Sequence, residues 1–249
     1  GKIFVQLMHC GRVGHPHNLP EGARVLAPSA VAAPGQMYTD AEGMQDIPVP
    51  AAMTAQDIEA AIESYVHASK VAVEVAGFDG VELHGANGYL IDQFLNVASN
   101  QRTDEWGGDI AGRIHFAVEV ARRTTKAIGA DRVGMRISPF GAFNGMEPDP
   151  EHIELYDALA TALNSLGLVY VHVVDHSSLG TPEVNPKVKA VIRNKFKGTY
   201  ILSGGYDRKR AEADLLEGKG DLVAFGRPFM SNPDLVARMK NGTELAQPD

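Results

Sequence analysis

A histidine, an asparagine and a tyrosine lie within six positions, directly after a short apolar stretch at residues 78–83. They are His84, Asn87 and Tyr89, and the glycines around the asparagine allow the backbone to turn sharply there. Hydrogen-bonding side chains at the carboxyl end of a buried strand are the usual place for chemistry in a β/α barrel. The same stretch is also compatible with an ordinary strand-to-helix turn that carries a solvated histidine. The rest of the chain has to decide between these two interpretations.

Strands and helices alternate along most of the chain. Apolar stretches predict strands near residues 3–7, 78–84, 132–137, 168–174, 199–202 and 222–225. Apolar residues at helical spacing, together with residues that typically begin or end helices, predict helices near residues 54–76, 88–95, 111–128, 150–166, 186–196, 207–216 and 233–240. Strands that are apolar throughout are typical of a parallel sheet covered by helices. Nearly every strand ends in polar residues, which favours a barrel with one shared mouth over an open doubly wound sheet.

Six strands are predicted, whereas a closed β/α barrel has eight. Residues 13–53 follow the first strand and contain many glycine, proline and small residues without a helical period. We interpret this stretch as a long loop excursion over the strand ends, with room for short hairpins. The two remaining strands are either hidden in this excursion or are not part of this chain.

Composition and charge limit the classes of partner. The 249 residues suit one large domain, and the net charge of −8 argues against nucleic acid or an anionic membrane surface as the main partner. The single cysteine cannot form an internal disulfide and fits a reducing compartment. The sequence contains no apolar run of about 18 residues, which a membrane span needs. A cytoplasmic protein without a metal site is therefore expected.

Small residues and an arginine follow the last two predicted strands. Ser203, Gly204 and Gly205 come after one strand, and Gly226 and Arg227 come after the next. The loops after the last two strands of such barrels commonly bind phosphate through backbone N–H groups, and an arginine adds a permanent charge. The alternative is a tight turn beside a surface ion pair.

Two further polar residues lie at strand ends. Arg136 ends an apolar strand, where a guanidinium needs an anionic partner if it is buried. That partner is either a structural carboxylate or the developing charge of a bound ring system. Gln6 offers an amide that could bond the edge of a heterocycle or only a backbone group.

Taken together, five stretches of this chain resemble the old yellow enzyme family of FMN-dependent ene-reductases. The resemblance runs almost from end to end and is carried by residues 4–12 (FVQLMHCGR), 77–90 (GFDGVELHGANGYL), 99–108 (SNQRTDEWGG), 135–139 (MRISP) and 224–227 (AFGR). It implies a TIM (β/α)8-barrel and an oxidoreductase that uses FMN with NADPH or NADH. The cysteine-rich iron–sulfur site of the related dienoyl-CoA reductases is absent from this one-cysteine sequence.

The resemblance also implies a role for each candidate site residue. His84 and Asn87 would hydrogen-bond the carbonyl oxygen of an α,β-unsaturated small-molecule substrate, and Tyr89 would protonate its α-carbon. Gln6 would bond the pyrimidine edge of FMN, and Arg136 would stabilise the anionic reduced flavin. The FMN phosphate would be held by Ser203, Gly204, Gly205, Gly226 and Arg227.

The sequence departs from the family pattern in two ways. Met8 stands where the family often has a tryptophan in the substrate pocket. The six strands match the third to eighth strands of the barrel, so residues 1–249 are expected to form a single, incomplete barrel domain that could associate to complete itself. A non-catalytic fragment or assembly partner is therefore one alternative. A non-flavin barrel lyase or isomerase is another, but it would want a lysine or a carboxylate pair at the strand ends, and no lysine is found there.

Overall fold

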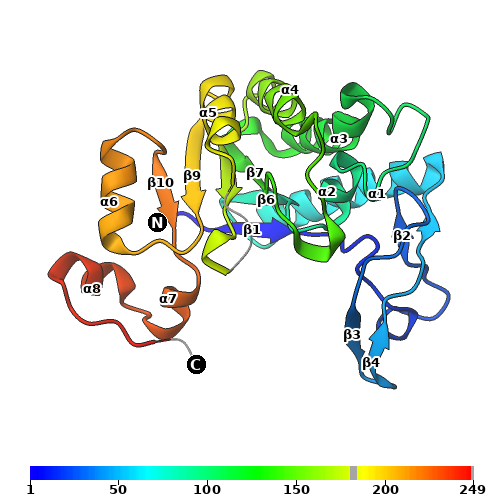
Figure 1. Ribbon diagram of the computed structural model, residues 1–249, viewed down its shortest axis with the longest axis horizontal. Coiled ribbons are helices and arrows are strands. Elements are labelled where there is room, and N and C mark those ends of the chain that lie inside the picture. The colour runs from blue at the N-terminus through cyan, green and yellow to red at the C-terminus, as the bar shows by residue number, and fades with distance from the viewer. Residues whose placement is uncertain (180–183, 248–249) are drawn as a thin grey trace.

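The computed structural model describes residues 1–179 and 184–247 as an α/β protein built on one curved parallel sheet (Figure 1). The strand order in the sheet is β1-β6-β7-β8-β9-β10, and each neighbouring pair is parallel. The strands are β1 (Phe4–Leu7), β6 (Gly80–Gly85), β7 (Val133–Ile137), β8 (Tyr170–Val174), β9 (Thr199–Ser203) and β10 (Leu222–Ala224). All six predicted strands are therefore confirmed.

Eight α-helices and five short helical turns connect the strands in the described residues. The α-helices are α1 (Ala55–Lys70), α2 (Leu90–Leu95), α3 (Ile110–Ile128), α4 (His152–Ser165), α5 (Pro186–Lys195), α6 (Arg208–Leu216), α7 (Arg227–Ser231) and α8 (Leu235–Asn241). The turns are η1 (Pro16–Asn18), the π-helical η2 (Val71–Val75), η3 (Ala130–Arg132), η4 (Phe143–Gly145) and η5 (Ser177–Leu179). Helix α7 was not predicted, because five residues are too few to show a period.

Local capping signals explain where several helices begin. Thr54 and Asp57 form a capping box at the start of α1, in which each side chain accepts the other residue's backbone N–H. Asn185 caps α5 and is followed by a proline, and Asp207 caps α6. Helix α4 begins at His152, two residues after the predicted proline start. None of the helices in the described parts of the chain is both long and apolar enough to cross a membrane.

Residues 13–53 fold into two small sheets of their own. Strand β2 (Leu26–Ala27) pairs in parallel with β5 (Ala51–Ala52), and β3 (Gln36–Thr39) forms an antiparallel hairpin with β4 (Gly43–Asp46). Neither joins the main sheet, so the interpretation that this excursion hides two barrel strands is wrong. The predicted loop with short hairpins is what the structure contains, and Figure 1 shows the β3–β4 hairpin projecting away from the sheet.

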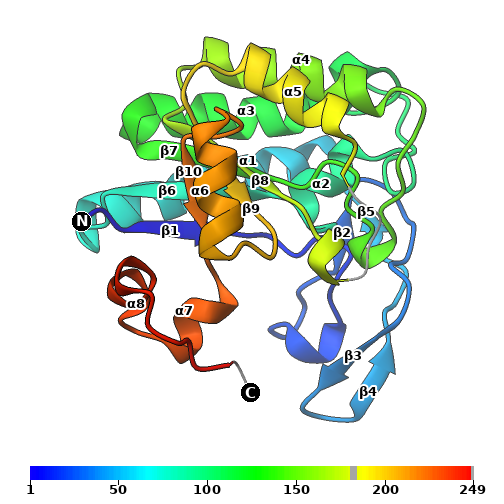
Figure 2. The same ribbon diagram turned by 60° about the vertical axis from the view of Figure 1, so that its left-hand side comes forward.

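The two faces of the main sheet differ in chemistry. The outer face lies against the helices and is apolar apart from the Tyr200 hydroxyl, with Val81, Leu83, Val133, Met135, Val171, Val173, Tyr200 and Leu202 in the core. Helices α1, α3, α4 and α5 pack side by side over this face, as Figure 2 shows. The opposite face, which we call the inner face, carries polar residues that alternate with the core residues along each strand.

Two glycines let large side chains fill the lower part of the inner face. A Cβ atom on Gly80 would overlap the ring of Phe4, and one on Gly134 would overlap the ring of Tyr170. The rings of Phe4 and Tyr170 lie 5.5 Å apart in a tilted arrangement. The amino end of the inner face is therefore packed with aromatic rings, and its polar groups lie nearer the carboxyl ends of the strands.

Candidate active site

Three polar residues lie in register across the inner face. His84 of β6 is the partner of Arg136 in β7, which is in turn the partner of His172 in β8. All three lie near the carboxyl ends of parallel strands, so the loops after these strands meet around them. The alternation of side chains fixes this arrangement, because a shift of one residue would turn them toward the helices.

His84 is a buried and uncharged base. His84 is only 1% exposed, and its Nδ1 atom has no hydrogen-bond partner in the described part of the chain. Burial and then the positive charge of Arg136 lower the pKa of His84 to about 4. The ring of Tyr89 lies 5.3 Å from the ring of His84. A neutral imidazole can donate one N–H to a ligand at neutral pH.

The turn after β6 presents Asn87 in an unusual backbone conformation. Asn87 has φ of +61° and Gly88 has φ of +73°, both in the left-handed region. The Asn87 N–H donates to Ser138 Oγ at 2.8 Å, and the Asn87 carbonyl accepts from Asn144 Nδ2 at 2.8 Å. The side-chain Oδ1 of Asn87 lies 2.6 Å from His176 Nε2. Residues from the loops after β7 and β8 therefore hold this turn.

Asp92 supports the same turn from below. Its Oδ2 atom accepts the Gly88 N–H at 2.8 Å and the Ser138 hydroxyl at 3.3 Å. Asp92 is 4% exposed, and burial raises its pKa to about 7, although both hydrogen bonds oppose the rise. The sequence indicates no role for Asp92, because the position of this residue on α2 relative to Ser138 depends on the tertiary fold.

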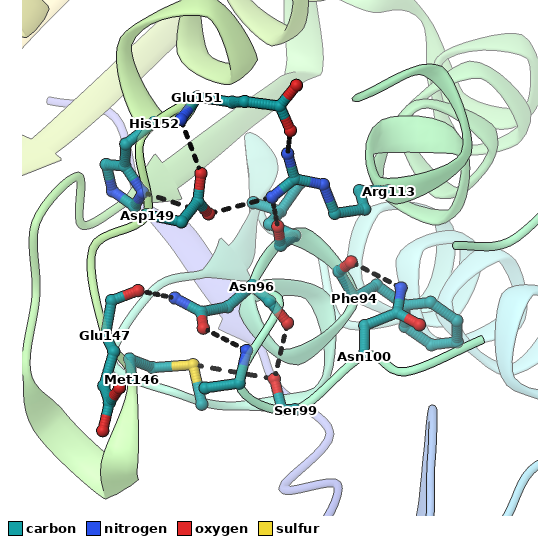
Figure 3. Close-up of polar contacts among 12 residues, drawn as sticks. Phe94, Asn96, Ser99, Asn100, Arg113, Met146, Glu147, Asp149, Glu151 and His152 are labelled. Carbon is teal, nitrogen blue, oxygen red and sulfur yellow. Dashed lines mark hydrogen bonds and ion pairs between the residues drawn. The ribbon is translucent and has the colours of Figure 1, made fainter. Parts of the chain in front are cut away.

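The loop that carries Ser138 and Asn144 is fastened at its far end by a buried arginine. Arg113 of α3 is fully buried, and its guanidinium contacts Asp149 at 2.9 Å and Glu151 at 2.8 Å. Figure 3 shows both carboxylates pointing at this guanidinium from the end of the loop, while the Asn96 amide reaches the Glu147 carbonyl at 2.8 Å. These contacts tie residues 147–151 to α3 and to the end of α2.

A second buried carboxylate organises the inner face below His84. Glu82 Oε1 accepts Gln6 Nε2 at 2.6 Å, and Glu82 Oε2 lies 2.9 Å from His172 Nδ1. Burial raises the pKa of Glu82, but His172 and the hydrogen bonds from Gln6 and Tyr170 outweigh it and hold the pKa below its ordinary value. The bond to Glu82 uses the NH2 end of the Gln6 amide, and the amide oxygen has no hydrogen-bond partner within residues 1–179 and 184–247. Glu82 lies within the motif at residues 77–90, but the sequence alone indicates no role for it.

Arg136 lies on the inner face without a paired carboxylate in the described residues. Its Nε atom is buried and has no hydrogen-bond partner there, and no carboxylate of that part of the chain lies within ion-pair distance. Burial lowers the pKa of Arg136, and the charge of Glu82 opposes this effect. A buried guanidinium with free donors is suited to an anionic ligand.

The glycine-containing loops after β9 and β10 start side by side. Ser203 of β9 is the register partner of Ala224 of β10, so the two following loops start at the same level. Gly204 and Gly205 have φ of +125° and +61°, and a Cβ on Gly204 would overlap the Asp175 carbonyl, so only glycine fits. The Ser203 hydroxyl is already bonded to the Val173 carbonyl at 3.2 Å.

Arg227 and Arg210 supply positive charge beside these glycines. Arg227 begins α7 directly after β10, is exposed, and has no ion pair within residues 1–179 and 184–247. Arg210 Nη1 donates to the Gly204 carbonyl at 3.0 Å, which the sequence analysis did not foresee. Backbone N–H groups of a glycine turn and a free guanidinium together are suited to a phosphate group.

The curved parallel sheet, its helical outer layer and its polar carboxyl rim define an α/β protein of the TIM-barrel type. A family model described as the NADH:flavin oxidoreductase / NADH oxidase family matches residues 1–246. The chain belongs to this family, and the resemblance to old yellow enzymes is confirmed.

Relatives and solved structures agree with this assignment. The chain is 40% identical, over all of its length and 68% of the relative, to a Leishmania infantum protein named as a probable flavin mononucleotide-dependent alkene reductase. It is 41% identical to a chanoclavine-I aldehyde reductase of Penicillium roqueforti, over 96% of this chain and 64% of that protein. The structure of morphinone reductase matches with a TM-score of 0.94 and 37% identity, and the old yellow enzyme from Trypanosoma cruzi with 0.91 and 34%. These matches cover all of this chain and 68% and 70% of the two solved chains.

The chain thus spans about two thirds of the length of the relatives it matches. The share is 64% for the Penicillium protein, 68% for the Leishmania protein and 74% for an Arabidopsis thaliana relative. One of the relatives, from Claviceps fusiformis and 35% identical, is named as a probable inactive dehydrogenase.

Proposed function

We propose that this chain is an FMN-dependent ene-reductase domain that reduces the activated double bond of α,β-unsaturated carbonyl compounds. The observation that carries the proposal is the convergence of His84, Asn87 and Tyr89 on one rim with Arg136 directly beside them. His84 and Tyr89 lie within ring contact of each other, and His84 and Arg136 are register partners. The names of the relatives as alkene and aldehyde reductases support a catalytic role over that of a non-catalytic fragment.

The residues of the inner face fit FMN. The free oxygen of the Gln6 amide suits a ring N–H, the unpaired donors of Arg136 suit a negatively charged ring edge, and the turn after β9 suits a phosphate. We therefore assign FMN binding to Gln6, Arg136, Ser203, Gly204, Gly205, Gly226 and Arg227. When bound, FMN supplies the hydride for the β-carbon of the substrate from its N5 atom.

The protein's own groups handle the oxygen and the proton. The neutral His84 and the NH2 group of Asn87 donate hydrogen bonds to the substrate carbonyl oxygen, which gains negative charge as the β-carbon receives hydride. Tyr89 is the one residue of the turn at 84–89 with a hydroxyl group, and it gives its proton to the α-carbon of the substrate. Fixed donors are effective here because they need no reorientation during the reaction.

NADPH or NADH is the proposed reductant, and the substrate is proposed to be a small-molecule enone. A relative, morphinone reductase, has been solved in complex with tetrahydroNAD, which supports a nicotinamide donor. Met8, which is 48% exposed at the exit of β1, would then contribute to substrate selectivity. We retain a cytoplasmic location, with neither nucleic acid nor membrane as a partner.

We also propose that residues 1–249 form one domain that can associate through the edges of its sheet. Strands β1 and β10 each pair on one side only within the described residues. Ile3 and Leu222 lie at these edges and are 65% and 54% exposed. Unpaired strand edges with exposed apolar residues favour pairing with further polypeptide.

The test is to purify the full chain with added FMN and to measure flavin absorbance, followed by oxidation of NADPH and NADH with 2-cyclohexenone. We expect a yellow protein whose oxidation of the nicotinamide depends on the enone. A protein that retains no FMN at micromolar concentration would contradict the proposed activity of this chain. The Arg136→Met variant is the matched control, because it should lose flavin affinity without disturbing the outer core.

A further inference from the structure

Asn87 has a hydrogen-bond partner at every polar group except its side-chain NH2. Its N–H donates to Ser138 Oγ, its carbonyl accepts from Asn144 Nδ2, and its Oδ1 lies 2.6 Å from His176 Nε2. Within residues 1–179 and 184–247, no acceptor is bonded to Asn87 Nδ2. The backbone partners fix the position of the residue, but they leave the direction of its side-chain amide open. His176 is the contact that distinguishes the two directions.

A proton on His176 Nε2 selects one direction of the Asn87 amide. With a proton on Nε2, the imidazole can only donate at that atom, so it requires the oxygen end of the Asn87 amide. The reversed amide would set an NH2 group against an N–H group and would leave the oxygen facing the pocket. The His176 ring is itself held by the edge of Phe143, whose centroid lies 4.4 Å away at an interplanar angle of 61°.

We propose that His176 is a positioning residue that holds the Asn87 amide with its NH2 group toward the substrate. This inference rests on the proposed function and deepens it. The Asn87 position can then only donate, so the site selects ligands that present an acceptor oxygen, such as a carbonyl or nitro group. His176 acts through Asn87 and needs no contact of its own with the substrate.

The first experiment examines the full chain without cofactor, so that its outcome does not depend on FMN binding. ¹⁵N-edited NMR spectra would report the tautomer of His176 and the side-chain NH2 signals of Asn87. We expect a proton on His176 Nε2 and a shift of the Asn87 NH2 signals in His176→Phe. The His67→Phe variant, which changes an exposed histidine on α1, is the control and should leave them unchanged. A neutral His176 with its proton on Nδ1 would overturn the proposal.

The second experiment measures binding of 2-cyclohexenone to the oxidised, FMN-loaded protein without reductant. His176→Phe keeps an aromatic ring beside Phe143 but removes the donor, and we expect an affinity about tenfold weaker, the scale of one hydrogen bond. His176→Gln offers an amide donor and should restore most of the affinity. An unchanged affinity in His176→Phe would refute the proposal.

A double substitution separates positioning from direct contact. In an Asn87→Ala background, His176→Phe should cause no further loss of affinity, because the group that His176 positions is gone. A full additional loss would show that His176 contacts the ligand itself and would overturn the positioning role. If none of these proteins binds FMN, the proposed function fails, while the NMR experiment still decides the contact between His176 and Asn87.

Discussion

His84 and Arg136 face each other across adjacent parallel strands, so a buried base lies beside a permanent cation on the inner face of the sheet. Burial and this charge together bring the pKa of His84 to about 4. His84, the candidate donor to the substrate oxygen, is therefore uncharged at neutral pH. Its pKa depends on Arg136, which is also proposed to bind the cofactor.

An NMR titration can test the link between His84 and Arg136 directly. We expect His84 to titrate near pH 4 in the full chain without cofactor. In Arg136→Met the pKa should rise, yet stay below about 6.5, the ordinary histidine value, because burial is the larger cause. Arg122→Met on the surface of α3 should leave the titration unchanged. A His84 that titrates near 6.5 in the unmodified chain would contradict this electrostatic description.

Asp92 should make the protein less stable as pH rises from about 4 to about 7. The folded state keeps the Asp92 proton up to a pKa of about 7, whereas the unfolded chain loses it near 4. In this window the folded state binds more protons, so the free energy of unfolding falls with increasing pH. Asp92→Asn mimics the protonated carboxyl and should remove this slope. At pH 8 its free energy of unfolding should exceed that of the unmodified chain by up to about 4 kcal/mol.

Urea denaturation at pH 5 and pH 8 measures this difference. The control is Asp109→Asn at the amino end of α3, which removes an exposed carboxylate and should show no such divergence. If Asp92→Asn and the unmodified chain changed in parallel between the two pH values, the buried carboxyl would not have the raised pKa.

Replacing Arg227 by alanine should weaken FMN binding by about tenfold to a hundredfold, the scale of a charge-assisted hydrogen bond. Arg227 has no ion pair in the described chain, so its removal should leave the free energy of unfolding nearly unchanged. Fluorescence titration with FMN provides the affinity. Arg122→Ala, which removes another exposed arginine, should bind FMN normally. Equal FMN affinity in the Arg227→Ala and Arg122→Ala variants would show that Arg227 is an ordinary surface residue.

Tyr89→Phe should slow substrate reduction by at least about a hundredfold, the usual contribution of a positioned acid. The phenyl ring can keep the contact with His84 at 5.3 Å, so the turn should stay intact. Stopped-flow measurements should find that flavin reduction by NADPH is unaffected, while flavin reoxidation by 2-cyclohexenone is slow. Unchanged reoxidation would assign the proton to another donor.

Arg113→Met should destabilise the protein by about 3 kcal/mol, because it leaves Asp149 buried without its partner. Thermal and urea unfolding give the magnitude, and Arg122→Met serves again as the exposed comparison. Since Arg113 fastens the loop that carries Ser138 and Asn144, the variant should also weaken enone binding (Figure 3). A stable variant with normal binding would show that the loop is held by other contacts.

Most elements of this fold could be predicted from the sequence because their signals are local. The six strands are apolar runs. Thr54, Asn185 and Asp207 mark the starts of their helices, because their side chains cap backbone N–H groups within three residues. Helix α7 was missed because five residues are too few to show a period, and α4 and α8 each begin two residues after the proline that was expected to open them.

The residues of the candidate site also fall into two groups, those that the sequence predicts and those that only the tertiary structure identifies. Its rim residues lie at the carboxyl ends of strands, as His84 and Arg136 do, or directly after one, as Asn87 does, so chain order alone places them at one end of a parallel sheet. Glu82, Asp92 and His176 gained their roles only from the tertiary structure. Strand register brings Glu82 to Gln6, the loop after β8 brings His176 to Asn87, and the loop after β7 brings Ser138 to Asp92. Such contacts join residues up to 89 positions apart, and no local pattern encodes that distance.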